Sequence, residues 1–194
     1  MLNELNASVT LIVLQTQSHA RFLMAILCVL WILFFLSQAT GNRLLAFGIV
    51  PRQLYGLPGI LFAPFLHANF NHLFFNSIPL LILSDFLLMH GLPYFLYATF
   101  YIILISGSLI WCFARSGLYI GASAVITGYW ALLVSGIYQE GTLTAFILGG
   151  LSLYYFAGIF LGIFPQKKGV SWEGHLFGLL AGLATSFLFK SGHI

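Results

Sequence analysis

The chain has 194 residues, of which 60% are hydrophobic and only 6% are charged, and its mean hydropathy is +1.01. So few charged side chains could not cover the surface of a soluble protein of this length. The formal charge of +3 comes from basic residues that are scattered singly, apart from Lys167 and Lys168, so no nucleic-acid-binding surface is predicted. The composition therefore predicts an integral membrane protein whose solvent is the lipid bilayer.

Six apolar runs approach the roughly 20 helical residues that a bilayer core requires. Helices are expected because backbone groups in lipid must be hydrogen-bonded within the segment, and no alternating barrel pattern is present. The predicted spans are residues 22 to 38, 72 to 89, 93 to 113, 121 to 138, 142 to 164 and 173 to 190. The sequence thus predicts one all-α membrane domain over residues 22 to 190, preceded by a cytoplasmic or interfacial segment, 1 to 21, and followed by a short tail, 191 to 194.

The first connection, residues 39 to 71, is long and contains apolar stretches that are too short to span a membrane. We expect it to lie in the membrane interface and to pack on the bundle. The fourth span is short, so we expect its helix to begin below the membrane surface.

Polar residues at membrane depth are costly unless they are paired or hydrated, so they mark candidate functional positions. The first cluster runs from His67 to Asn76 and places His72 and Asn76 four residues apart on one helix face. Both side chains could donate hydrogen bonds to one point. Caps or links between helices would explain them equally well, and His67 is interpreted as a structural histidine of the loop.

The second cluster is Gly121-Ala122-Ser123-Ala124, in which small residues flank a serine at the start of a predicted helix. A serine there has its own N–H free at the positive end of the helix dipole, which suits an oxyanion. Helix capping is the ordinary explanation for a serine in this place. On this cluster alone both interpretations stay open.

The third cluster is a histidine, His175, that opens the last span, with Gly178 and Gly182 three and seven residues later. The glycines form a small-residue stripe that lets another helix approach closely, and His175 lies on the same face. An interhelical hydrogen bond would by itself explain the histidine.

The three clusters open the second, fourth and sixth spans, so they lie on the same side of the membrane and can meet. Ser123 and His175 supply a nucleophile and a general base, while His72, Asn76 and the Ser123 amide supply donors for an oxyanion. Glu173, two residues before His175, points to another helix face. The pattern predicts a catalytic dyad rather than a triad, with no metal and no cofactor.

These motifs, His-x-x-x-Asn, Gly-x-Ser and His-x-x-Gly-x-x-x-Gly in this order, resemble those of the rhomboid family of intramembrane serine proteases, and the resemblance covers residues 60 to 185. It implies a six-helix bundle in which Ser123 attacks a peptide carbonyl and His175 takes and returns the proton. In the same bundle, His72 and Asn76 would stabilise the oxyanion.

The resemblance also implies partners and access routes. Substrates would be single-pass transmembrane proteins that enter laterally from the bilayer and are cleaved near the membrane surface. The span 142 to 164 would form the gate, and residues 165 to 172 would form a cap over the site.

Two residues depart from the family pattern, since Ala124 stands where the family usually has Gly and Thr127 stands where some members have a tyrosine that packs on the catalytic histidine. They motivate an alternative, a catalytically inactive rhomboid-like protein that binds membrane helices. A Trp-Arg pair that is common in the family's first loop is not evident.

A third hypothesis is a channel, transporter or metal site built on His67, His72 and His175. It is disfavoured because the candidate carboxylate within the spans, Asp85, lies near the opposite end of the second span, and no His-Glu-x-x-His motif is present.

The family orientation puts the amino terminus in the cytoplasm and the site on the extracytoplasmic face, which we expect to be that of a bacterial inner membrane. Charge counting predicts the reverse topology. In the family orientation the basic residues outside are Arg43, Arg52, Arg115, Lys167 and Lys168, and those inside are Arg21 and Lys190. We adopt the family orientation because it puts the site on the extracytoplasmic face and because the difference in the number of basic residues is small.

Overall fold

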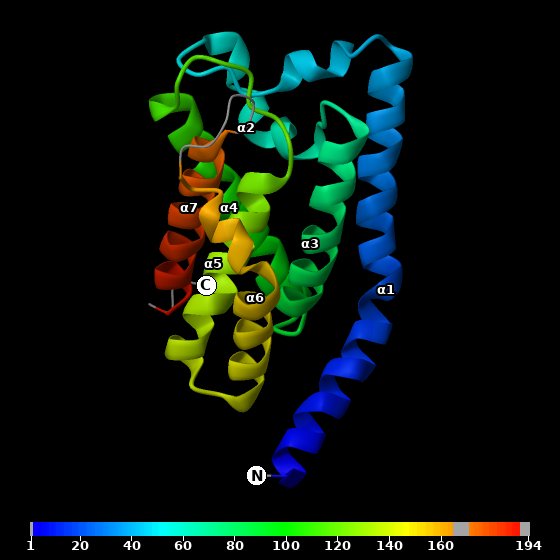
Figure 1. Ribbon diagram of the computed structural model, residues 1–194, viewed down its shortest axis with the longest axis vertical. Coiled ribbons are helices and arrows are strands. Elements are labelled where there is room, and N and C mark those ends of the chain that lie inside the picture. The colour runs from blue at the N-terminus through cyan, green and yellow to red at the C-terminus, as the bar shows by residue number, and fades with distance from the viewer. Residues whose placement is uncertain (1, 165–170, 191–194) are drawn as a thin grey trace.

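The computed structural model of the chain describes residues 2–164 and 171–190, and helices dominate it (Figure 1). The long helices are α1 (Leu2–Ala39), α3 (Phe70–Leu88), α4 (Leu92–Phe113), α5 (Ser123–Glu140), α6 (Leu143–Leu161) and α7 (Trp172–Lys190). Short helices occupy the first connection, namely η1 (Arg43–Phe47), η2 (Leu54–Gly56), α2 (Gly59–Phe62) and η3 (Ala63–Phe65). No β-strand is present in the described ranges, so the all-α prediction is confirmed.

Three of the long helices are long and apolar enough to cross a membrane by length and composition, namely Asn6–Ala39 within α1, α3 and α4. The other long helices, α5 to α7, coincide with the remaining predicted runs, and the count of six spans stays a prediction. Large aromatic side chains face outward: Phe35, Phe75, Phe113 and Phe187 are 58%, 67%, 70% and 68% exposed. Such a surface is suited to lipid rather than to water.

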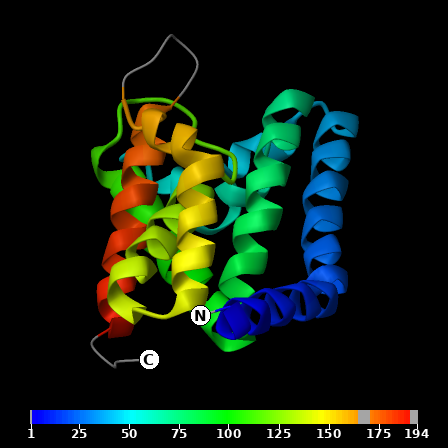
Figure 2. The same ribbon diagram turned by 60° about the horizontal axis from the view of Figure 1, so that its bottom comes forward.

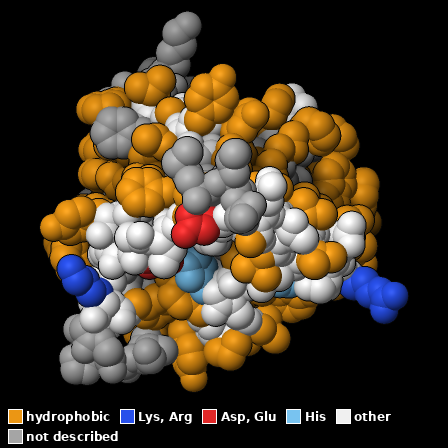
Figure 3. All heavy atoms as spheres, turned by 90° about the horizontal axis from the view of Figure 1, so that it is seen from below, with side chains coloured by type: hydrophobic (Ala, Val, Ile, Leu, Met, Phe, Trp, Pro, Cys, Tyr) orange, Lys and Arg blue, Asp and Glu red, His pale blue; other side chains and the backbone are white. Residues whose placement is uncertain are grey.

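The first helix begins well before residue 22, where the sequence predicted its start. Its segment contains neither Gly nor Pro before Gly41, so nothing in the chain interrupts the helix. Figures 1 and 2 show that the first part of α1 bends beneath the bundle. There the side chains of Thr16 and His19 contact Asp85 of α3, at 2.6 and 2.9 Å. Figure 3 shows this lower end of the molecule, where acidic and histidine side chains lie among apolar ones.

The first connection packs on the carboxyl end of α4. The Arg52 main-chain N–H donates to the Trp111 carbonyl at 2.9 Å, and its guanidinium donates to the Ala114 carbonyl at 2.7 Å. In return, the Trp111 indole N–H donates to the Gln53 carbonyl at 3.0 Å. The bonds from Arg52 satisfy carbonyls at the end of α4 that have no donor within the helix. The three bonds hold the connection against α4, and its place in the membrane interface stays a prediction.

The helix α5 packs closely against α7 through the predicted stripe of glycines. A Cβ atom on Gly178 would lie 2.2 Å from the Ala124 carbonyl oxygen, and one on Gly182 would lie 2.2 Å from the Gly128 carbonyl oxygen. These separations are too short for any side chain. The glycines therefore set the distance between the two helices. In Figure 1, α5 also begins deeper in the bundle than the upper ends of α3 and α4.

Replacing Gly178 with Ala should lower the free energy of unfolding by about 1–3 kcal/mol, because the added methyl group collides with the α5 backbone. The matched control is Gly150→Ala in α6, where a Cβ would meet no heavy atom within 4 Å. That control should be neutral or stabilising by about 0.4–1 kcal/mol. Unfolding in detergent micelles measures both variants, and equal stabilities would contradict the role given to the stripe.

Candidate active site

A cavity of about 610 Å³ lies between the first connection, α3, α4, α5 and the start of α7. The four side chains singled out from the sequence all line it: His72, Asn76, Ser123 and His175. Much of the remaining lining is apolar and includes Ile60, Ile103 and Ile120. The structure thus brings the three polar clusters, far apart in sequence, to one place.

Ser123 is the first residue of α5 and does not serve as its cap. The cap position is Ala122, and no side-chain capping bond is made there. The Ser123 N–H belongs to the first turn, where helix N–H groups have no acceptor within the helix, and it lies at the positive end of the helix dipole. The Ser123 carbonyl accepts a hydrogen bond of 2.8 Å from the Thr127 hydroxyl. Ser123 is therefore held by its main chain, and its hydroxyl is not used as a cap.

The turn before Ser123 depends on Gly121. Its φ of +107° is rarely adopted by L side chains, and a Cβ there would lie 2.5 Å from the Cε1 atom of His72. Only glycine meets both conditions. This contact brings the backbone before the serine directly against the ring of His72.

The imidazole of His175 is fixed by a main-chain carbonyl. Its Nδ1 atom lies 3.1 Å from the Gly162 oxygen, just after the end of α6. A carbonyl can only accept, so Nδ1 carries the proton in this bond, and Nε2 is the basic nitrogen of the neutral ring. Within residues 2–164 and 171–190, no hydrogen bond joins Ser123 Oγ to His175. Such bonds are often long before substrate binds.

The ordinary explanation for His175, a hydrogen bond to another helix, is thus met in part, because the ring bonds to Gly162 in the turn that follows α6. This bond occupies one ring nitrogen and leaves the other available.

The oxyanion candidates lie on one face of α3, as predicted. The cap of α3 is Asn69, whose side chain accepts from the His72 main-chain N–H at 2.9 Å. Neither His72 nor Asn76 is thus the capping side chain. The Asn76 Nδ2 atom is buried and makes no hydrogen bond among the described residues. A buried donor left unsatisfied costs about 1–3 kcal/mol, so this donor is suited to an oxygen that enters the cavity.

His67, interpreted from the sequence as a structural loop histidine, supports the turn that leads to Ser123. It is 1% exposed, its Nε2 accepts a long hydrogen bond of 3.5 Å from the Ala122 N–H, and its ring packs edge-on against His72 at 5.1 Å. Burial, with the nearby His72, lowers the pKa of His67 to about 4. The neutral ring is the form that can accept from Ala122.

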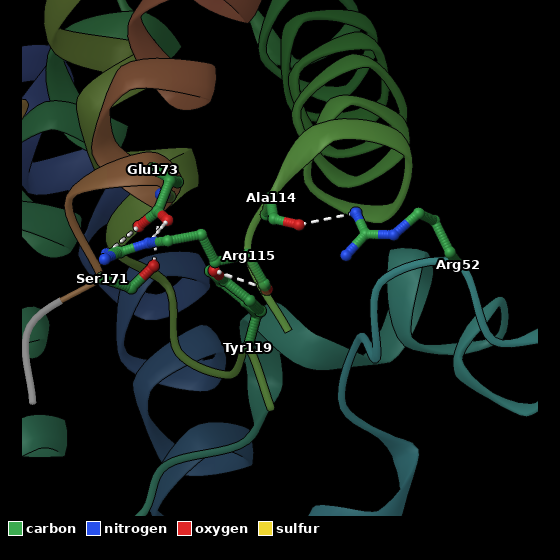
Figure 4. A network of polar contacts seen from close by, with 7 residues as sticks. Arg52, Ala114, Arg115, Tyr119, Ser171 and Glu173 are labelled. Atoms are coloured by element: carbon green, nitrogen blue, oxygen red, sulfur yellow. Dashed lines mark hydrogen bonds and ion pairs between the residues drawn. The ribbon is translucent and has the colours of Figure 1, made fainter. Parts of the chain in front are cut away.

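An ion pair beside the site was not predicted from the sequence. Arg115, in the connection between α4 and α5, binds the carboxylate of Glu173 at the start of α7 (Figure 4). The sequence placed Glu173 on another face from His175, which fits this pairing. The signal that could have found Arg115 is the carboxylate itself, since an acid in the first turn of a span needs a cation.

The cap and the gate that the family resemblance implies stay predictions. Of the predicted cap over residues 165 to 172, residues 165–170 lie outside the described residues. The predicted gate, 142 to 164, corresponds to α6, which ends at Leu161 and is kinked at Phe156 (φ −119°, ψ 15°). The kink at Phe156 precedes Gly162, whose carbonyl contacts the His175 ring.

Residues 51–192 match the family description of the Rhomboid domain. A protein of Mycobacterium tuberculosis whose name assigns no function is 37% identical over 180 residues, which are 87% of this chain and 74% of that protein. A similarly unassigned protein of Mycobacterium leprae is 33% identical over 179 residues, 87% of this chain and 70% of the relative. A protein of Acanthamoeba polyphaga mimivirus, named as a rhomboid protein, is 31% identical over 136 residues, 66% of this chain and 73% of its own length. The chain belongs to the rhomboid family and is a membrane protein.

The low pKa of His67 predicts a pH dependence of stability. Between about pH 4 and pH 6.5 the unfolded chain binds a proton at His67 and the folded chain does not. Stability must therefore rise with pH across this window, by up to about 1.4 kcal/mol per pH unit from this group, and fall on acidification. His67→Gln, which keeps an acceptor for Ala122, should reduce the slope. Unfolding of both proteins from pH 4.5 to 7 measures it, and identical slopes would refute the assignment.

Proposed function

We propose that the chain is an intramembrane serine endopeptidase in which Ser123 is the nucleophile and His175 the general base. The observation that carries the proposal is the shared cavity, which places both residues beside the unpartnered Asn76 donor and His72. Membership of the rhomboid family supports the same class of activity. No metal or cofactor is part of the proposal.

The chemistry follows from the tautomer of His175. Nε2 takes the proton from Ser123 Oγ as that oxygen attacks the scissile carbonyl. The charge that develops on the carbonyl oxygen is stabilised by the Ser123 N–H, Asn76 Nδ2 and His72. His175 then gives its proton to the leaving amine, and a water attacks the acyl-enzyme by the reverse sequence. Gly162 keeps the ring oriented throughout, because its carbonyl accepts from Nδ1.

The membrane setting is part of the proposal. The helices α1 and α3 to α7 would form six spans in a bacterial inner membrane, with the cavity toward the extracytoplasmic face. Substrates would be single-pass transmembrane proteins, since the mostly apolar cavity suits an unwound segment of an apolar helix. The mycobacterial relatives support a bacterial setting.

The competing candidate is an inactive rhomboid-like binder of membrane helices, motivated by Ala124 and Thr127. In the structure the Ala124 backbone lies against Gly178, and Thr127 bonds to the Ser123 carbonyl. The orienting contact that a tyrosine supplies in some members is replaced by Gly162. The contact with Gly162 thus orients His175 without a tyrosine, which favours the enzyme.

A fluorophosphonate probe, which reacts with activated serines, tests the dyad directly. Labelling of the wild-type protein in detergent should be lost in Ser123→Ala and in His175→Ala, because one lacks the nucleophile and the other its base. Ser108→Ala is the matched control, as Ser108 is exposed on α4 and should leave labelling unchanged. A folded wild type that does not label would favour the binder.

Asn76→Leu should separate activity from stability. Removal of the oxyanion donor should slow labelling by about 100-fold or more. Stability should be unchanged or increased, because the variant removes a buried donor without a partner. Labelling rate and unfolding measured on the same sample give the result. A variant that is less stable and labels normally would assign Asn76 a structural role instead.

A further inference from the structure

We infer that Arg115 and Glu173 are positioning residues, whose ion pair holds the first turn of α7 and thereby sets His175 against Ser123. The inference rests on the proposed function, because it concerns the same dyad. Neither residue lines the cavity, so neither is assigned a chemical step.

Glu173 is a buried carboxylate on the side of α7 away from the chemistry. It precedes His175 by two residues, and side chains two apart on a helix do not face each other. It is 4% exposed, and a buried carboxylate without a partner strongly destabilises a fold. Its place in the first turn is compatible with the helix dipole. Arg115, whose side chain is 71% exposed, supplies the partner for this acid from the surface side of the turn.

Arg115 holds two successive residues of α7. Its Nε donates to Oε1 of Glu173, and its Nη2 donates to Oε2 at 3.2 Å. Its guanidinium carbon lies 5.7 Å from the ring centroid of Trp172. A two-point contact fixes orientation as well as distance, and the ring adds a cation–π interaction. The pair thus limits both rotation and tilt of the first turn.

Arg115 is itself anchored to the segment that leads to the nucleophile (Figure 4). Its carbonyl accepts from the Tyr119 hydroxyl at 3.1 Å. The main chain of Tyr119 is paired in both directions with Ile49, at 2.9 and 3.0 Å. The ion pair therefore links the segment just before Ser123 to the turn that carries His175.

The glycine stripe cannot replace this link. Gly178 fixes the separation of α5 and α7 one turn deeper than His175, but a contact below leaves the end of a helix free to tilt. The main-chain N–H of Gly174 donates to the Ser171 hydroxyl at 3.3 Å, which is a bond within the same turn. Among the described contacts, the Arg115–Glu173 pair is the charged link between this turn and the segment before Ser123.

The test uses the full chain in detergent and the second-order rate of fluorophosphonate labelling per folded molecule. Glu173→Gln and Arg115→Gln should each lower this rate about 10-fold or more, since a small misplacement of a reacting group is costly. The double variant should be no slower than the single ones, because both remove the same contact. Arg115→Lys keeps the charge without the two-point geometry and should give an intermediate rate.

Arg52→Gln is the control, because Arg52 binds the carbonyls of Cys112 and Ala114 at the end of α4. It should lower the melting temperature and leave the labelling rate per folded molecule unchanged. If the single variants do not fold, the double variant decides, since it leaves no unpaired charge. A double variant that labels at the wild-type rate overturns the positioning role and leaves the proposed function intact. A wild type that does not label overturns the proposed function itself.

Discussion

The close contact between α5 and α7 is the constraint on which the rest of the structure depends. Gly178 and Gly182 bring the α7 backbone against the carbonyls of Ala124 and Gly128. Lipid tails give packed helices little hydrophobic driving force, so such backbone proximity is a main source of helix association in a membrane. The same contact places the helix that starts at Ser123 beside the helix that carries His175. The contact that packs these two helices together therefore also sets the geometry of the site.

Around this contact, the main chain satisfies most of the polar groups that lipid would penalise. His175 donates to a carbonyl, His67 accepts from an amide, and the Thr127 hydroxyl donates to the Ser123 carbonyl. Backbone partners are fixed by the fold and carry no net charge, so they hold the side chains without adding an ion to the bilayer. Four buried side-chain atoms of the described residues depart from this pattern and make no hydrogen bond: Ser37 Oγ, His67 Nδ1, Trp172 Nε1 and Asn76 Nδ2. Of these, Asn76 Nδ2 belongs to a side chain that lines the cavity together with Ser123 and His175. An oxygen of a bound substrate would accept a hydrogen bond from this donor, as the proposed function requires.

Hydropathy predicted α3, α4, α5 and α7 to within about two residues at each end, because the runs are bounded by Gly, Pro or charge. The polar clusters at the starts of three spans predicted that Ser123, His175, His72 and Asn76 could meet, and the four side chains line one cavity. Their catalytic roles stay a proposal. The early start of α1 was missed because the polar residues Gln15 to His19 separate the apolar run 11–14 from the span predicted to begin at residue 22. The Gly162 carbonyl was missed for another reason: a main-chain acceptor has no residue type to recognise. The acid in the first turn of α7 indicated that a cation lies near, but Arg115 is 58 residues away in sequence and no local pattern identifies it.

The proposed dyad would need no third acidic residue, because of where that acid would have to lie. A carboxylate beside His175 would be buried at membrane depth, where an ion is tolerated only with a partner. The Gly162 carbonyl selects the same tautomer as a carboxylate would and needs no counter-ion. The acid that does stand near, Glu173, is bound by Arg115 on the other side of the helix. The ring of His175 is thus oriented by a neutral acceptor, the Gly162 carbonyl. The inferred role of the Arg115–Glu173 ion pair is to hold the helix that carries this ring.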